Sequence, residues 1–395
     1  MTLAVKRMTI YPLSFPLGRK VSHATSERAV SEPIVVAVEL MNGAVGYGET
    51  LPREYVTGET NASVLELLQG EFARELLAFS PRSFPEALEA IDALPSIDEG
   101  GMNCSAARAC VELALLDAVL RSGNRSLDSV VGWLGDPRLG TPGSARTARF
   151  SMVLASDSLE SNVRSARLAK WAGFRNFKLK VGMSDDDARV ETIARVIGRL
   201  LSRGKATLRL DANGVWDVEQ AVEFLNRWRH LPLSGIEQPL PRSKDRDLVE
   251  LKKRCDVPVF HDESLSTLED AERLHELGVA DGFNIRVSKC GGLLAALKLA
   301  SFAIKRNIQT QLGCMVGETS LLSAAGVRFI QMTPGVQFCE GSFGPLLSRH
   351  DIAEKRVRFT WAGSLPKLHE RGLGVDVSNE LLLQLTKGKP IVIEL

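Results

Sequence analysis

Residues 176–182 read NFKLKVG, a strand-like stretch with two lysines that are separated by a single leucine. Successive side chains of a strand point to opposite faces, so Lys178 and Lys180 share one face. Lysine is almost never fully buried unless its charge is paired. Two buried ammonium groups would therefore need partners, and the stretch raises the question of what they meet.

Strand-like and helical stretches alternate from about residue 147 onward. This alternation is typical of parallel strands joined by helical crossovers. Eight strands at this spacing predict an α/β fold, a closed (β/α)₈ barrel or a close variant. A doubly wound open sheet is the alternative, although no G-x-G-x-x-G follows the first strand. The strand-like runs are RFSMVLA (149–155), NFKLKVG (176–182), ATLRLDAN (206–213), SGIEQPL (234–240), VPVFHDES (257–264), DGFNIRVSK (281–289), IQTQLGCM (308–315) and GVQFCEG (335–341).

Three of these runs carry an acidic residue at or near their ends, namely Asp211, Glu237 and Asp262. In a (β/α)₈ barrel the C-terminal strand ends form one rim, and the active site lies there. The three acids are each about one βα unit apart, so they are expected at one level on consecutive strands. Converging carboxylates need a counter-charge, and an all-oxygen donor set favours Mg²⁺ over Zn²⁺.

The strand-end lysines complete this pattern. Lys180 ends the strand before the three acids, and Lys289 ends the strand after them, so the two are expected to face each other across the barrel mouth. A lysine beside another cation can act as a general base, and two opposed lysines can serve both faces of one carbon. Lys178 would add positive charge for an anionic substrate and lower the pKa of Lys180.

Three further polar residues near the rim have open roles. Asn213, two residues after Asp211, could contact the metal shell or cap a helix. Glu263 could join the site or only fix a lysine. His261 precedes the acid pair and alternates away from it, which favours a packing role.

Composition bounds the function class. The 395 residues carry 49 basic and 48 acidic side chains, a formal net charge of +1, with 44% hydrophobic and 25% charged residues. This composition is typical of a globular protein with a large core. A nearly neutral chain argues against nucleic-acid or membrane-surface partners. No signal-peptide pattern and no run of 18 apolar residues occur, so a cytoplasmic location is expected.

The pattern of cysteines indicates reduced thiols rather than disulfide bonds. Six are scattered along the chain, and none forms a CxxC pair. We expect most of them in the core. Cys290 and Cys314 lie close to polar segments, so a cysteine nucleophile is an alternative, but no histidine stands in a convincing partner position.

The first 140 residues differ in character from the barrel region. TIYPLSF (9–15) and PIVVAVEL (33–40) are strand-like, and Asn42-Gly43 predicts a hairpin turn. Helices are expected within 60–95 and over 103–122, whereas IVIEL at the C-terminus predicts a strand. Pro142 and Gly143 mark a boundary. The predicted domains are residues 1–140, 141–345 and 346–395, the last returning to the first.

Taken together, these motifs resemble the enolase superfamily, specifically its muconate-lactonizing-enzyme subgroup. The motifs are FKLKVG (177–182), LDANG (210–214), GIEQP (235–239), FHDES (260–264) and RVSKCGG (286–292), with GYGETLPREYVTGET (46–60) and ELALLDAVLRSGN (112–124) before them. The resemblance implies a modified (β/α)₇β barrel with an α+β capping domain built from N-terminal and C-terminal segments. It implies Mg²⁺, or Mn²⁺ as a substitute, held by Asp211, Glu237 and Asp262. Lys180 and Lys289 would be the acid/base catalysts for removing a proton α to a carboxylate.

The resemblance leaves the substrate open, because the subgroup contains muconate cycloisomerases, o-succinylbenzoate synthases, N-acylamino acid racemases and dipeptide epimerases. Dipeptide epimerases typically carry DxD on the eighth strand, where this chain has Glu340 and Ser342. A small-molecule carboxylate converted by cycloisomerase chemistry is therefore the leading interpretation, with Glu340 still able to meet a cation. The loops 18–27 and 50–58 are expected to close on the substrate.

Two interpretations from other classes stay open. A (β/α)₈ barrel with a reactive strand-end lysine could be a Schiff-base aldolase, which would need no metal. A family member without catalysis could act as a binding protein, although it should lack one of the five core residues. The family often assembles, so a homo-oligomer is compatible with the sequence.

Overall fold

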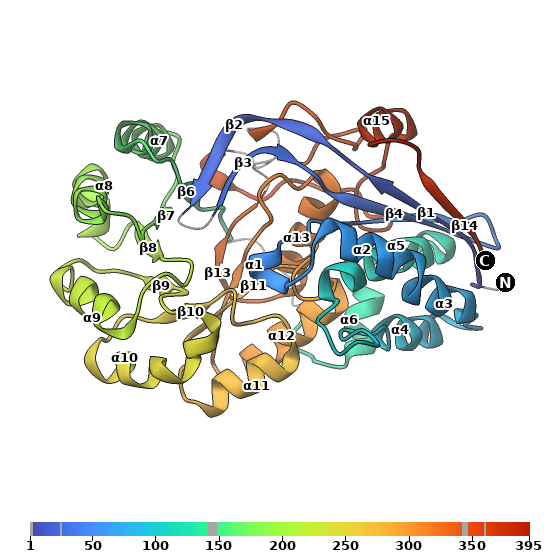
Figure 1. The fold of residues 1–395 in the computed structure, drawn as a ribbon, viewed down its shortest axis with the longest axis horizontal. Coiled ribbons are helices and arrows are strands. Elements are labelled where there is room, and N and C mark those ends of the chain that lie inside the picture. The colour runs from blue at the N-terminus through green and yellow to red at the C-terminus, as the bar shows by residue number, and fades with distance from the viewer. Residues whose placement is uncertain (1–2, 24–25, 141–147, 342–346, 359–360) are drawn as a thin grey trace.

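The computed structural model describes residues 3–23, 26–140, 148–341, 347–358 and 361–395, with side chains 19–28 left aside. Figure 1 shows two parts of the molecule. Strands β6–β13 curl within a ring of helices, and a separate sheet lies beside them, with both chain termini at its far edge. Parallel strands form the first part and antiparallel strands the second. The expected barrel and cap are therefore both present.

The barrel strands follow chain order, β6 to β13, and each pairs with the next in parallel. The ring closes where Ser151 N donates to Cys339 O at 2.7 Å, beside a bridge between Phe150 and Cys339. This closure confirms the (β/α)₇β barrel and rules out the open sheet. The elements are β6 (Met152–Leu154), α7 (Leu159–Trp171), β7 (Asn176–Lys180), α8 (Asp186–Leu201), β8 (Thr207–Asp211), α9 (Val218–Arg227), β9 (Gly235–Glu237), η1 (Arg242–Asp247), α10 (Leu248–Arg254), β10 (Val259–His261), α11 (Leu268–Glu276), β11 (Gly282–Ile285), α12 (Leu293–Lys305), β12 (Gln309–Leu312), α13 (Ser320–Met332) and β13 (Val336–Cys339).

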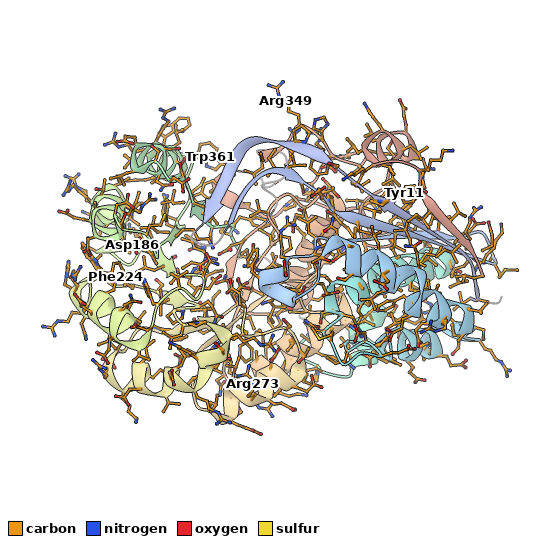
Figure 2. The ribbon with its side chains drawn as sticks, in the orientation of Figure 1. Tyr11, Asp186, Phe224, Arg273, Arg349 and Trp361 are labelled. Atoms are coloured by element: carbon orange, nitrogen blue, oxygen red, sulfur yellow. The ribbon has the colours of Figure 1, made fainter. Side chains whose placement is uncertain are left out.

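Strand β7 shows how the barrel uses its alternation. Phe177 and Leu179 are fully buried apolar residues, whereas Lys178 bonds to acids of other barrel strands and so points into the barrel. Apolar residues pack against the surrounding helices, which carry exposed polar side chains on their outer faces. Figure 2 places Asp186, Phe224 and Arg273, from α8, α9 and α11, in this helical layer.

The capping domain contains a four-stranded antiparallel sheet in the order β14-β1-β4-β5. The predicted Asn42-Gly43 turn joins β4 to β5, and the C-terminal strand pairs with β1, with Met8 opposite Ile393. The elements are β1 (Val5–Pro12), β2 (Phe15–His23), β3 (Ser26–Ser31), β4 (Ile34–Leu40), β5 (Val45–Thr50), α1 (Glu54–Thr57), α2 (Asn61–Gln69), α3 (Glu71–Ala78), α4 (Phe84–Asp92), α5 (Ser105–Gly123), α6 (Asp128–Leu134), α15 (Asn379–Leu385) and β14 (Ile391–Glu394). The short helix η2 (Trp361–Gly363) lies instead against the barrel, where Phe150 N donates to Gly363 O at 2.7 Å.

Helix α5 lies directly against this sheet. Its residues from Ser105 to Leu120 are buried. A Cβ added to Gly48 of β5 would lie 1.9 Å from the carbonyl oxygen of Cys110 on α5, so helix and strand approach at a distance that only glycine permits. The absence of a side chain at Gly48 thus allows this close packing.

The predicted domain boundaries stay predictions. Residues 141–147, with Pro142 and Gly143, and residues 342–346 lie outside the described parts of the chain. Within the described ranges, every helix is too short or too polar to cross a bilayer.

Candidate active site

The three strand-end acids come together at one end of the barrel. Asp211 ends β8, Glu237 ends β9, and Asp262 directly follows β10. Asp211 and Glu237 are register partners, and Glu237 pairs with Phe260, so Asp262 stands two residues further along its strand. All three side chains are buried. The expected convergence is present, with Asp262 slightly beyond the level of the other two.

Lys178 is the common counter-charge of this cluster. Its Nζ lies 2.6 Å from Glu237 Oε1, 2.9 Å from Asp211 Oδ2 and 3.0 Å from Glu340 Oε2. Burial opposes the positive charge, but the three carboxylates outweigh it and raise the pKa of Lys178 well above its usual value. Lys178 thus meets three protein carboxylates, and its expected role toward an anionic substrate stays a prediction.

Lys180 stands at the rim with two partners. Its Nζ donates to Asp211 Oδ2 at 2.6 Å and to Asn213 Oδ1 at 2.7 Å. Asn213 adopts a left-handed backbone (φ 48°), which turns its side chain back toward the barrel, and its Nδ2 donates to Glu263 Oε1 at 3.0 Å. Asn213 therefore links Lys180 to Glu263.

Lys289 does not end a strand, which corrects the sequence prediction. Strand β11 stops at Ile285, and Lys289 lies in the turn before α12. Its fully buried Nζ donates to Asp262 O at 2.6 Å, Asn284 O at 2.8 Å and Asp262 Oδ1 at 3.0 Å. The turn thus brings Lys289 back to the rim, on the opposite side of the ring from Lys180, because β7 and β11 are four strands apart in a ring of eight.

Sequence reasoning missed two arginines of this site. Arg286, just beyond β11, pairs with Asp262 Oδ2. Arg209, inside the barrel on β8, donates to Glu340 Oε1 at 3.1 Å and stacks on Phe338 at 4.1 Å from the ring centre. The signal was available, because Arg209 stands two residues before Asp211 and so shares its face, by the same argument that applies to Lys178 and Lys180.

Glu340 lies inside this ion network. Its carboxylate meets Lys178 and Arg209, and Gln311 Nε2 bridges Glu237 Oε2 at 2.8 Å and Glu340 Oε1 at 3.3 Å. This placement favours charge balance over the substrate contact expected for Glu340. Ser342, the other residue expected on the eighth strand, lies outside the described residues.

Other candidates lie apart from the cluster. His261 is buried, and its Nε2 contacts Val279 O at 3.0 Å, as expected for a packing residue. Burial raises the pKa of Cys290 and Cys314, and Glu318 and Glu340 add to the effect at Cys314. Neither thiol is therefore prepared as a thiolate nucleophile.

The carboxylates of the cluster differ in charge state. Burial opposes ionisation of Asp211 and Asp262, but the cations beside them outweigh it and lower both pKa values. Burial raises the pKa of Glu237 and Glu263 to about 7, with Asp211 adding to the effect at both and Asp262 at Glu263 in particular. Glu237 and Glu263 are therefore held closer to their neutral forms than Asp211 and Asp262.

The donor set fits a hard divalent cation. Asp211, Glu237 and Asp262 offer carboxylate oxygens, and Glu263 Oε2 is buried without a hydrogen-bond partner among the described residues. In the described part of the chain, no three acidic, histidine or cysteine side chains are arranged to hold an ion, and oxygens of Glu237 and Asp262 instead contact Lys178 and Arg286. Binding a cation would therefore displace these groups from some of their partners.

A small cavity of about 10 Å³, with room for about one water molecule, adjoins the ion network. Arg286 and Glu340 reach it from the network, and Phe150, Cys314 and Glu318 line its other sides. Charged groups of both signs and an aromatic ring thus face the same space.

Comparisons with known proteins agree with this geometry. Residues 162–381, more than half of the chain, match the family model described as "Enolase C-terminal domain-like". The chain is 29% identical to muconate cycloisomerase 1 of Rhodococcus opacus over 383 residues, 95% of this chain and 96% of the relative. It is 25% identical to N-succinyl-L-Arg/Lys racemase of Bacillus cereus over 394 residues, 99% of this chain and 100% of the relative.

A solved structure shares the whole fold. The dipeptide epimerase of Cytophaga hutchinsonii, determined with Mg and D-Ala-L-Val, superimposes with a TM-score of 0.85 at 22% identity and covers 99% of this chain and 100% of its own. The family model, the relatives and the barrel with its cap agree. The chain belongs to the enolase superfamily, in the subgroup of the muconate-lactonizing enzyme, and is an isomerase or lyase of that family.

Proposed function

We propose that this enzyme removes the proton α to the carboxylate of a small substrate in the presence of Mg²⁺, with Lys180 and Lys289 as the acid/base pair. The observation that carries the proposal is the placement of the two lysines on opposite sides of the barrel, each bonded to a different acid of the cluster. Opposed ammonium groups can reach both faces of one carbon atom.

The lysines have distinct surroundings for this work. Lys180 is partly exposed, held by Asp211 and Asn213, whereas Lys289 is fully buried on Asp262 and two carbonyl oxygens. In its neutral form either lysine can take the α-proton, while the other, as an ammonium group, returns a proton or faces the negative charge. The fixed donors keep both Nζ atoms in position during the transfer.

Asp211, Glu237 and Asp262 would hold the metal ion, with Glu263 beside them. When bound, Mg²⁺ would stabilise negative charge that develops on the carboxylate of the substrate. Mn²⁺ would serve in its place. The site contains equal numbers of acidic and basic side chains, five of each. A divalent cation therefore leaves an excess of positive charge, which favours an anionic substrate. The acids are Asp211, Glu237, Asp262, Glu263 and Glu340, and the bases are Lys178, Lys180, Arg209, Arg286 and Lys289.

Within this chemistry we favour a muconate cycloisomerase-like reaction, supported by the full-length similarity to muconate cycloisomerase 1. N-acylamino acid racemisation is the second candidate, supported by the equally complete match to the N-succinyl-L-Arg/Lys racemase. A dipeptide substrate is less favoured because Glu340, which would meet its ammonium group, is engaged by Lys178 and Arg209.

Proton exchange in D₂O, followed by NMR with Mg²⁺ present, tests the proposal. The panel contains unsaturated dicarboxylates including muconate, N-succinyl amino acids, and dipeptides. We expect loss of an α-proton signal or formation of a lactone from one class. Lys180→Ala is expected to lower the rate of turnover by about 10²–10⁴-fold. Its binding of Mg²⁺, measured by calorimetry, should be nearly unchanged. Asp211→Asn is expected to lose Mg²⁺ binding.

Lys205→Ala, which removes an exposed lysine, is the matched control and should behave as the wild type. Exchange that continues in EDTA would contradict the role of the metal ion. Normal turnover by Lys180→Ala would contradict the acid/base assignment. An adduct trapped by borohydride would instead support a Schiff-base enzyme.

A further inference from the structure

The turn that carries Lys289 lies against the capping domain. It connects β11 to α12, and its glycines Gly291 (φ 86°) and Gly292 (φ 120°) adopt a backbone that other residues rarely reach. A Cβ on Gly292 would lie 1.5 Å from Glu112 Oε2 of helix α5. The turn thus packs against α5 with no space for a side chain.

Glu112 caps the helix that follows this turn. Its carboxylate accepts hydrogen bonds from Leu293 N at 2.5 Å and Leu294 N at 2.9 Å, the first backbone donors of α12. These donors have no partner within their own helix. A carboxylate at a helix N-terminus is favourable, and here it comes from the other domain. Glu112 therefore fixes the C-terminal end of the Lys289 turn.

Arg108 and Ser288 fix the rest of the turn. Arg108, one helical turn before Glu112 on α5, is buried and donates from Nη1 to Gly291 O at 2.6 Å. The side chain of Ser288, directly before Lys289, contacts Thr50 Oγ1 at 2.9 Å, at the end of β5. Contacts from two elements of the capping domain thus bracket Lys289 on both sides.

Lys180 has a different support. It belongs to β7 itself, and its partners Asp211 and Asn213 come from the neighbouring barrel strand and the residues just after it. Lys289, by contrast, stands four residues beyond its strand, on a turn that the capping domain holds. Damage to the α5 contact should therefore affect one lysine and spare the other.

We propose that Arg108 and Glu112 are positioning residues, through which the capping domain sets the position of Lys289 in the barrel. This inference rests on the proposed acid/base role of Lys289. A displacement of about 1 Å of a reacting group can cost about 100-fold in rate, so the rigidity of this turn bears directly on proton transfer. The capping domain thus helps to hold one member of the acid/base pair, Lys289, in position.

Glu112→Gln tests the contact with little change in shape. The amide keeps one acceptor, but its NH₂ group must face a backbone N–H. Asp117→Asn is the matched control, because Asp117, also buried on α5, accepts from Leu373 N and Tyr47 N and does not contact the Lys289 turn among the described residues. Hydrogen exchange measured by mass spectrometry should rise about 10-fold at residues 289–294 in Glu112→Gln only.

The catalytic readout separates the two lysines. The probe is the pair of enantiomers of whichever N-succinyl amino acid or dipeptide the panel above identifies. Lys180→Ala should still exchange the α-proton of the enantiomer that Lys289 deprotonates. Glu112→Gln should lower exchange of that enantiomer by about 10–100-fold and leave the other within about twofold. Arg108→Lys should show the same selectivity.

Each other outcome has a definite meaning. Equal loss for both enantiomers, or the same selective loss in Asp117→Asn, overturns the positioning role. Unchanged hydrogen exchange at residues 289–294 in Glu112→Gln overturns the contact itself. Absence of exchange in the wild type across the whole panel refutes the proposed function instead, and the hydrogen-exchange result then still decides whether α5 fixes the turn.

Discussion

Two groups of buried carboxylates in this protein are neutralised in different ways. At the barrel mouth, Asp211, Asp262 and Glu340 pair with lysine and arginine side chains. Elsewhere, three buried glutamates of the capping domain instead accept hydrogen bonds from backbone N–H groups at helix N-termini. Glu49 accepts them from α13, Glu59 from α5 and Glu112 from α12.

The two groups titrate in opposite directions. Burial opposes ionisation in both, but at the mouth the cations outweigh it and lower the pKa values of Asp211, Asp262 and Glu340. At the helix ends burial dominates, so the pKa rises to about 8 for Glu49 and to about 7 for Glu112, although N–H groups offset part of the effect. Formal charge is thus fixed at these three carboxylates of the mouth, whereas Glu237 and Glu263 there, with pKa values of about 7, resemble the helix-end glutamates.

Removing the central cation of the mouth should have the largest effect. Lys178→Met leaves Asp211, Glu237 and Glu340 without their shared ammonium group. Breaking a buried ion pair from one side costs about 3–5 kcal/mol, because the remaining charge stays buried. We expect a loss of this size in the free energy of unfolding, measured by urea denaturation at pH 7 without metal.

Lys253→Met is the control, because Lys253 is exposed and pairs only with Glu250 among the described residues. It should leave stability nearly unchanged. A loss below about 1 kcal/mol in Lys178→Met would show that the mouth does not depend on cations. The two groups of carboxylates would then differ less than their contacts indicate.

Protonation should have a smaller, pH-dependent effect at the helix ends. The pKa of Glu49 is raised from its usual 4.5 to about 8 in the folded protein. The folded state therefore binds a proton that the unfolded state has lost between these values, and stability falls as pH rises through this range. Glu49→Gln imitates the protonated form, so its stability relative to the wild type should rise between pH 5 and pH 9 by on the order of 2–4 kcal/mol.

Urea denaturation at pH 5, 7 and 9 measures this difference. Glu99→Gln, which changes an exposed carboxylate, should follow the wild type at every pH. If the curves of Glu49→Gln and the wild type ran parallel, Glu49 would be ionised at all three pH values. The helix-end carboxylates would then resemble those of the mouth.

Much of this comparison could be predicted from sequence. Strand–helix alternation predicted the barrel, and the spacing of Asp211, Glu237 and Asp262 predicted their convergence, because parallel strands place their ends at one rim. The returning C-terminal strand was also correct, since an apolar run at the chain end needs a sheet to join.

What sequence could not predict depends on contacts between distant segments. Lys289 was predicted to end a strand, whereas β11 ends at Ile285 and the chain turns through Gly291 and Gly292, which have positive φ. The position of Lys178 among three carboxylates follows from strand register, which the sequence of one strand does not contain. Nothing in the sequence around Glu49, Glu59 and Glu112 marks them as residues that bind the N-termini of other helices.

The smallest effect should come from an exposed ion pair of similar length. Arg195 Nη2 and Glu191 Oε1 on α8 are 2.8 Å apart, about as close as Lys178 and Asp211, but their side chains are 71% and 61% exposed. Water screens such pairs, and ordering two long side chains costs entropy. Arg195→Ala should therefore change the free energy of unfolding by no more than about 0.5 kcal/mol.

This measurement, repeated at low and high salt, shows whether the distance between two charges or their burial determines how much an ion pair stabilises the protein. Arginine and alanine are both good helix formers, so the substitution leaves α8 otherwise intact. A loss above about 1 kcal/mol that disappears at high salt would mean that exposed pairs of this chain stabilise it nearly as much as the mouth does. A negligible change, set against the loss in Lys178→Met, would show that burial gives the ion pairs of the barrel mouth their energetic importance.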